Sequence, residues 1–187
     1  MHIPDGYISP ATAAALYVAA TPFWVRASQK VKQHLTGRFV PLIALFSAFS
    51  FVIMMFNVPL PGGTTGHAVG ATLAGIVLGP WPAVLAVSVA LIIQAIFFGD
   101  GGILAIGANV VIMAVAMPFV GSFIYRAIAG GSDVTSRRRA VAAGIAGYVA
   151  INVAALLTGV ILGVQPLLYR DAGGNAVFLG ADGSSLF

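Results

Sequence analysis

The chain begins MHIPDG, with a histidine directly behind the start methionine. The N-terminal amine, the backbone nitrogen of His2 and the His2 ring nitrogen Nδ1 are joined by short covalent tethers. A metal ion bound to all three closes a five-membered and a six-membered ring, both of low strain, and the donors lie nearly in one plane. A square-planar set of nitrogen ligands suits Ni(II) or Cu(II). The opening residues therefore predict an N-terminal metal chelate.

A second histidine, His67, can supply the fourth nitrogen of such a site. We therefore predict Met1, through its amine, together with His2 and His67 as the ligands of one divalent metal ion. Because the backbone nitrogen must lose its proton and the rings must be neutral, binding should weaken in acid. Asp5 and Thr65 are the candidates for supporting contacts around these ligands. A carboxylate in the sequence PDG is equally typical of a turn.

The composition is that of a membrane protein. Of the 187 residues, 59% are hydrophobic and 7% are charged, whereas soluble domains carry about 25% charged residues. The mean hydropathy is +1.01. The chain has no cysteine, which excludes disulfides, thiolate metal sites and cysteine nucleophiles. The first residues lack a basic segment and a small-residue cleavage site, so we expect no cleaved signal peptide.

Six apolar segments approach the length of about 20 residues that a membrane helix needs. They cover residues 8–25, 40–58, 66–78, 83–98, 103–128 and 140–164. The sequence thus predicts an all-α polytopic membrane helix bundle of six spans, forming a single domain over residues 1–187. Residues 165–187 are expected to form a polar tail at the outer face. The short segment 66–78 and its successor could instead be two half-helices that meet at GPWP, if protein buries the break.

The basic residues indicate the orientation in the membrane. Eight of the nine fall in or beside two predicted loops: Arg26, Lys30, Lys32 and Arg38 at one, and Arg126, Arg137, Arg138 and Arg139 at the other, with Arg126 at the end of the span that leads into it. With six crossings both loops lie on the same side, which is cytoplasmic by the positive-inside rule. The N-terminus, His67 and the tail are then outside, and His34 is a solvated residue of the inner loop. Since the charges are explained as topology signals, we expect no nucleic-acid partner.

Other function classes fit the sequence less well. The chain contains no P-loop sequence, so any ATP hydrolysis must come from a partner. An intramembrane protease needs a catalytic pair at depth, and the predicted spans offer none. A non-catalytic assembly subunit stays open as an alternative, as does a binding component for an organic vitamin, which would use aromatic residues rather than a terminal chelate. We expect a binding component that is not an enzyme and uses no organic cofactor.

Four stretches carry a family resemblance: MHIPDGYISP, VPLPGGTTGHAVGA, LGPWPAVL and FFGDGGILAIGAN. They resemble the substrate-binding (S) component of energy-coupling factor transporters for cobalt and nickel, the CbiM/NikM family, from Met1 to about Gln165. The resemblance implies Co²⁺ or Ni²⁺ as the transported substrate and Met1, His2 and His67 as its ligands. It also implies a transmembrane coupling (T) component, two ATPase subunits and a small accessory membrane subunit as partners, in the cell inner (plasma) membrane.

The resemblance adds two further expectations. The family has a seventh, C-terminal helix, so residues 165–187 are expected to lead toward a last helix that this sequence lacks. Members with this set of motifs resemble cobalt carriers that feed cobalamin synthesis, which places cobalt first as the substrate. The nitrogen chelate prefers nickel on chemical grounds, and nickel is kept as the alternative.

Overall fold

The computed structural model describes residues 2–33, 39–59 and 65–178, and helices dominate it. The elements, in chain order, are α1 (Pro10–Gln33), α2 (Phe39–Met54), β1 (Val58–Pro59), β2 (Thr65–Gly66), α3 (Ala71–Leu78), α4 (Pro80–Ile93), η1 (Gln94–Phe98), α5 (Ile106–Asn109), η2 (Val110–Ala116), α6 (Met117–Ala129) and α7 (Arg137–Leu168). The elements η1 and η2 are π-helices that continue α4 and α5. The two short strands pair antiparallel. The predicted all-α membrane helix bundle is confirmed.

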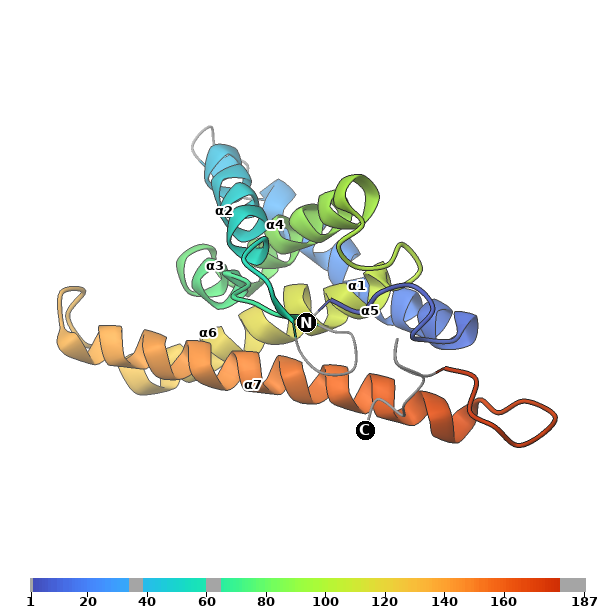
Figure 1. The fold of residues 1–187 in the computed structure, drawn as a ribbon. Coiled ribbons are helices and arrows are strands. Elements are labelled where there is room, and N and C mark those ends of the chain that lie inside the picture. The colour runs from blue at the N-terminus through green and yellow to red at the C-terminus, as the bar shows by residue number, and fades with distance from the viewer. Residues whose placement is uncertain (1, 34–38, 60–64, 179–187) are drawn as a thin grey trace.

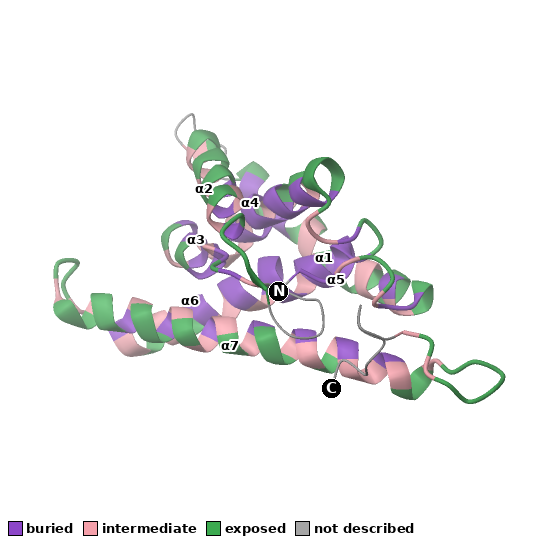
Figure 2. Ribbon diagram, in the orientation of Figure 1, coloured by how far each residue is buried: buried purple, intermediate pink, exposed green. Residues whose placement is uncertain are grey.

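The helix α4 lies at the centre of the bundle. It packs against α1, α2, α3 and η2, while α6 packs mainly against α7. In Figure 1 the long helix α7 runs along one side of the molecule beside α6, and the N-terminus lies near the middle of the bundle. Figure 2 shows that α4, α5 and η2 are largely buried, whereas α2 and much of α7 are exposed. The N-terminal segment reaches these buried helices at Ile3, whose backbone N–H donates to Oδ1 of Asn109 in α5.

The helix lengths refine the predicted spans. Within the described residues, Pro80–Phe98, Ile106–Ala129 and Arg137–Leu168 are long and apolar enough to cross a membrane. The helix α3 has eight residues, about 12 Å of helix, so the segment 66–78 is not one continuous membrane helix. The start of the predicted tail is also corrected. The helix α7 continues past residue 165 to Leu168, because Gln165 is a buried residue of that helix.

The GPWP turn lies at the end of the bundle that carries the basic residues of the first predicted loop. Gly79, with φ 89°, separates α3 from α4, and Pro80 begins α4. Lys30 lines the same cavity as residues 79–82, and the Arg26 guanidinium lies 5.7 Å from the centre of the Trp81 ring. The chain therefore runs through α3 to this end and returns through α4.

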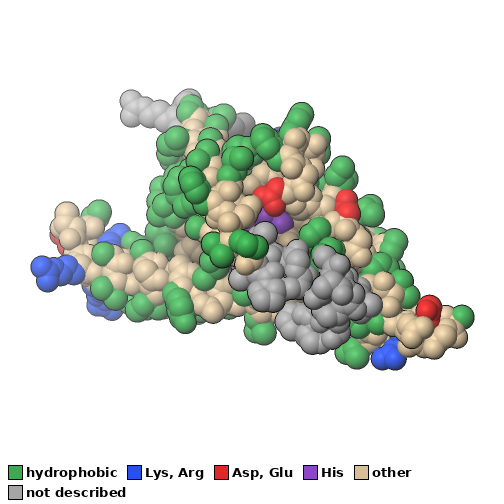
Figure 3. Space-filling view, viewed as in Figure 1, with side chains coloured by type: hydrophobic (Ala, Val, Ile, Leu, Met, Phe, Trp, Pro, Cys, Tyr) green, Lys and Arg blue, Asp and Glu red, His purple; other side chains and the backbone are tan. Residues whose placement is uncertain are grey.

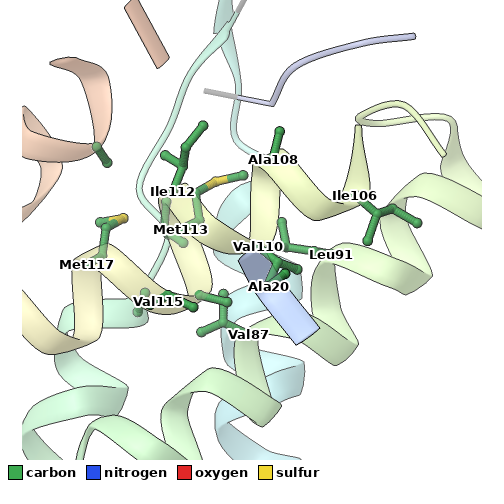
Figure 4. Packing of buried hydrophobic residues seen from close by; sticks show 14 of the residues in the cluster. Ala20, Val87, Leu91, Ile106, Ala108, Val110, Ile112, Met113, Val115 and Met117 are labelled. Carbon is green, nitrogen blue, oxygen red and sulfur yellow. The ribbon is translucent and has the colours of Figure 1, made fainter. Parts of the chain in front are cut away.

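Buried aliphatic side chains join α4 to the α5–η2 helix. Figure 4 shows Leu91 of α4 beside Val110, and Val87 beside Val115 of η2. All four residues belong to one hydrophobic cluster, and Val87 and Val110 are fully buried. Burial of such a side chain stabilises the fold by roughly 1.5–3 kcal/mol. This contact fixes the two helices. Their connection, residues 99–105, forms one wall of the site together with α5.

Close packing between α3 and α6 depends on a glycine. A Cβ atom at Gly75 would lie 2.9 Å from both the Cα and the carbonyl oxygen of Pro118. Small residues allow membrane helices to approach closely, and here the neighbour is backbone, which cannot rotate away. The packing of α3 therefore requires that position 75 carry no side chain.

Gly75→Ala should destabilise the protein, because the added methyl group must push α3 away from α6. Overpacking of this kind costs about 1–3 kcal/mol. Gly144→Ala in α7 is the matched control, since nothing lies within 4 Å of a Cβ built at Gly144. Thermal unfolding of the detergent-purified variants should give a lower Tm for Gly75→Ala only. Equal Tm values would contradict the packing argument.

Candidate metal centre

The N-terminal segment is held in place by hydrogen bonds from the α4–α5 connection and from α5. The backbone N–H of Ile3 donates to Oδ1 of Asn109 at 2.8 Å, and Nδ2 of Asn109 donates to the carbonyl of Ile3 at 3.2 Å. The same carbonyl accepts the backbone N–H of Gly102 at 3.0 Å. Ile3 is fully buried. The residue that follows His2 is therefore fixed at both of its backbone polar groups.

Asp5 forms a second set of hydrogen bonds between the N-terminal segment and the α4–α5 connection. Its two carboxylate oxygens accept the backbone N–H groups of Ile103 and Leu104, both at 2.9 Å. Gly102 permits this approach, since a Cβ there would collide with Asp5. The structure thus places Asp5 as an anchor of the N-terminal segment. The supporting role that the sequence suggests for Asp5 around the metal ligands stays a prediction.

His2 and His67 lie side by side, although they come from different segments. Their ring centres are 4.6 Å apart and the ring planes differ by 23°. Both residues are buried, with 3% and 7% of their surface exposed. In Figure 3 the histidine atoms are recessed near the middle of this face, with an acidic side chain beside them. The structure therefore brings together two of the three predicted ligands. Met1, His34 and the side chain of Thr65 lie outside the described residues.

The orientation of the His67 ring fixes its tautomer. Its Nδ1 atom lies 3.2 Å from the carbonyl oxygen of Ala68. Because a carbonyl can only accept, Nδ1 must carry the proton and Nε2 must present a lone pair. That Nε2 atom is buried and has no hydrogen-bond partner among the described residues. A buried acceptor without a partner is costly, so its lone pair is available for a ligand such as a metal ion.

Asp100 completes the surroundings of His2. Its Oδ1 atom lies 3.3 Å from Nδ1 of His2. Burial and the positive N-terminal amine lower the pKa of His2 from 6.5 to about 3, against an upward effect of Gln94. Burial, the amine and His2 lower the pKa of His67, also to about 3. Both rings lie outside the helices and are neutral at pH 7, which is the form that binds metal. The contact with Asp100 is therefore not an ion pair.

Side chains alone do not complete a metal site. Over residues 2–33, 39–59 and 65–178, no group of three or more His, Cys, Asp or Glu side chains is placed to hold a metal ion. Two imidazoles leave further coordination positions to be filled. Backbone and terminal nitrogens are the donors that the sequence predicts for these positions. Within the described residues the two imidazoles therefore need donors other than His, Cys, Asp or Glu side chains, and the N-terminal chelate stays a prediction.

Three residues beside the candidate ligands are not distinguished by the sequence. Asp100 in FGDGG is typical of a turn, yet it contacts His2. Gln94 and Asn109 are uncharged polar residues near predicted spans, and such residues usually tie helices together. Asn109 instead binds Ile3, and Gln94 approaches His2. The available signal was that Asp100 and Asn109 fall within FFGDGGILAIGAN, one of the stretches that carry the family resemblance.

Acid should destabilise the protein through its two buried imidazoles. Burial lowers their pKa from the ordinary value of 6.5 to about 3, so between these pH values the unfolded chain binds protons that the folded chain excludes. The free energy of unfolding then falls as pH drops below 6.5, by at most about 1.4 kcal/mol per pH unit for each ring. We expect Tm to fall between pH 7 and pH 4.5, with a smaller fall for His67→Gln. The same fall in both proteins would contradict the assignment.

Loss of the Asn109 amide should loosen the N-terminal segment. Asn109→Leu removes two hydrogen bonds to Ile3, each worth about 1 kcal/mol, so nickel affinity should fall by at least roughly tenfold. Asn152→Leu is the matched control, because the Asn152 amide donates only to Tyr148 in its own helix, at 2.7 Å. Nickel titration of both purified variants checks this expectation. Equal affinity of the two variants would show that Asn109 does not position the site.

Comparisons with known proteins identify the family of this chain. The family model described as cobalt uptake substrate-specific transmembrane region, CbiM, matches residues 2–181. The chain is 54% identical over 178 residues to the fused nickel transport protein NikMN of Rhodobacter capsulatus, covering 95% of this chain and 51% of that protein. It is 47% identical over 180 residues to the probable fused nickel transport protein LarMN of Lactiplantibacillus plantarum, covering 95% of this chain and 53% of that protein. The chain spans about half the length of these relatives.

A solved structure shares the fold. The crystal structure of a truncated transition metal transporter superimposes with a TM-score of 0.91 at 48% sequence identity, covering 100% of this chain and 84% of that one. Fold and sequence similarity therefore extend over the whole bundle and include the N-terminal segment. The chain belongs to the CbiM family of cobalt uptake substrate-specific transmembrane regions.

Proposed function

We propose that this chain captures a divalent nickel or cobalt ion at the outer face of the membrane, as the substrate-specific component of an uptake transporter. The observation that carries the proposal is the pair of buried imidazoles, His2 and His67, whose centres lie 4.6 Å apart. The proposed donors are the amine of Met1, the backbone nitrogen and Nδ1 of His2, and Nε2 of His67. The metal ion is the transported substrate and is not a resident cofactor.

The separation of the rings suits two imidazoles that share one metal ion. With a metal–nitrogen bond of about 2.0 Å, the ion lies roughly 3.2 Å from each ring centre, and two such ligands at a right angle place the centres about 4.5 Å apart. The observed separation of 4.6 Å is close to this value. In the proposed square-planar chelate the backbone nitrogen of His2 is the middle one of three linked donors. Nε2 of His67 would therefore lie opposite that nitrogen and at a right angle to Nδ1 of His2.

The donor chemistry favours nickel over cobalt. Four nitrogen donors in a plane suit Ni(II), and nickel stands above cobalt in the affinity order of divalent metals. Nickel also promotes loss of the backbone proton more readily than cobalt. The two relatives described above are named as nickel transport proteins, whereas the family description names cobalt uptake. We therefore propose nickel as the preferred substrate and keep cobalt, which the sequence motifs place first, as the alternative.

The carboxylate of Asp100 supports a positively charged complex in a buried position. A divalent ion bound to one deprotonated backbone nitrogen carries a net charge of +1, and burial of an uncompensated charge is unfavourable. Asp100 lies 3.3 Å from Nδ1 of His2 and is proposed to offset that charge. Asp5 and Thr65 are proposed to keep the N-terminal segment and the His67 segment in place around the ion.

Uptake needs an energy source outside this chain. The sequence contains no P-loop, and the family resemblance implies an energy-coupling factor transporter. We propose that the chain works with a transmembrane coupling component, two ATPase subunits and a small accessory membrane subunit in the inner (plasma) membrane. In this proposal the chain binds the ion, and its partners hydrolyse ATP.

Blocking the N-terminal amine tests the chelate. Acetylation, or one residue added before Met1, converts the amine to an amide and removes a donor, so nickel binding should be lost. A tag at the C-terminus leaves the amine unchanged and is the matched control. His67→Ala should weaken binding strongly, whereas His34→Ala should leave it intact. Competitive nickel and cobalt titration of the detergent-purified proteins, followed by absorbance, measures affinity and coordination geometry together.

The outcomes separate the alternatives. About one equivalent of nickel bound by the unmodified protein, with the absorbance of a square-planar complex, supports the proposal. Retained affinity after N-terminal extension would exclude the amine as a ligand. If the unmodified protein bound neither metal, a non-catalytic assembly subunit would be the better description.

A further inference from the structure

The side-chain amide of Gln94 is buried beside the candidate metal centre, and its role there is not explained by the fold. It is the first residue of η1, and 1% of its surface is exposed. Neither its Oε1 nor its Nε2 atom has a hydrogen-bond partner among the described residues. Leaving a buried polar group unsatisfied costs roughly 1–3 kcal/mol. The buried amide of Gln94 lies next to the proposed metal site. We therefore expect it to have a role when a metal ion is bound there.

The neighbour of Gln94 is His2. The Gln94 side chain interacts with the His2 ring. The turn at η1 explains this proximity. The carbonyl of Gln94 accepts the backbone N–H of Asp100 at 3.1 Å, so the chain folds back on itself over the π-helix. One turn thus places both Gln94 and Asp100 beside the His2 ring. Turns of π-helix are often found at functional sites.

The chemistry of the chelate defines what His2 needs. A ring that binds metal through Nδ1 carries its proton on Nε2, and that N–H group requires an acceptor in a buried site. Metal-bound histidines usually donate the second N–H to a carboxylate or carbonyl, which fixes the tautomer and the ring orientation. His67 already has such a partner in the carbonyl of Ala68. For the His2 ring, the side-chain carbonyl oxygen of Gln94 is a buried candidate acceptor.

We propose that Gln94 is a positioning residue whose Oε1 atom accepts the Nε2–H of His2 and so selects the tautomer that directs Nδ1 to the metal ion. This inference rests on the proposed chelate. Asp100 acts on the opposite ring nitrogen, since its Oδ1 lies 3.3 Å from Nδ1. A proton on Nδ1 would favour the contact with Asp100, whereas a proton on Nε2 favours Gln94 and leaves Nδ1 for the metal. Gln94 therefore biases the ring toward the binding form.

The test compares two buried glutamines. Gln94→Leu removes the proposed acceptor of the His2 ring, so nickel affinity should fall about 10- to 100-fold. Gln165→Leu is the matched control. Gln165 is equally buried, but its Oε1 accepts the N–H of Ser9 and its Nε2 donates to the carbonyl of Ile161. This variant should have a lower Tm and should keep its nickel affinity.

A spectroscopic readout distinguishes positioning from a general structural effect. Nitrogen-15 NMR of histidine-labelled protein should show the Nε2–H tautomer of His2 reduced in Gln94→Leu and retained in Gln94→Glu, which keeps an acceptor oxygen. Gln94→Glu should also recover nickel affinity. The absorbance spectrum of bound nickel should be the same in all three proteins, because Gln94 is not proposed as a ligand.

Several results would overturn the inference. Unchanged nickel affinity in Gln94→Leu would do so, as would an equal loss of affinity in Gln165→Leu. An altered nickel spectrum in Gln94→Leu would show that the amide binds the metal directly and would replace the proposed role. If the unmodified protein bound no nickel at all, the proposed function itself would fail. The two failures are therefore distinguishable.

Discussion

The candidate metal centre depends on one non-covalent pairing, that of the N-terminal segment with residues 99–109. A chain end is conformationally free, and ordering each of its residues costs about 1–2 kcal/mol. The reciprocal hydrogen bonds between Ile3 and Asn109, the bond from Gly102 and the burial of the Ile3 side chain offset this cost. Because His2 is covalently joined to Ile3, the hydrogen bonds of Ile3 also determine where His2 lies. Without the pairing, His2 and His67 would be two unrelated histidines.

The segment that receives the N-terminus is shaped by the membrane helices on either side of it. Gly99 and Gly101 have φ values of 65° and 87°, which glycine adopts without strain. A Cβ atom at Gly101 would also lie 3.2 Å from Cδ2 of the His2 ring and 3.1 Å from Nδ2 of Asn109. The apolar contact between α4 and η2 holds the two ends of this connection together. A hydrophobic core thus determines the distances between polar groups that lie outside it.

The sequence predicts those parts of the site that are local in the chain. The terminal chelate follows from residues that are covalent neighbours, and the apolar segments follow from composition. The proximity of His2 to His67 needs tertiary structure, and the positioning amide of Asn109 is indistinguishable in sequence from that of Asn152, which bonds only within its helix. The short length of α3 is also not evident from the sequence, because residues 68–70 are as apolar and small as the helix that follows.

The arrangement of donors also constrains how a bound ion could leave. In the proposed site three donors belong to the first two residues and stay together through covalent bonds. Their distance from His67, in contrast, depends on the hydrogen bonds of Ile3 and Asp5. Displacing the N-terminal segment would therefore separate the ion from His67 first and leave it on a three-nitrogen chelate. Complete release then requires a proton to return to the backbone nitrogen of His2. Capture in this site needs neutral rings, a docked segment and loss of the backbone proton of His2. Release needs the segment to move away from His67 as well, so release is the step that has to be coupled to a conformational change.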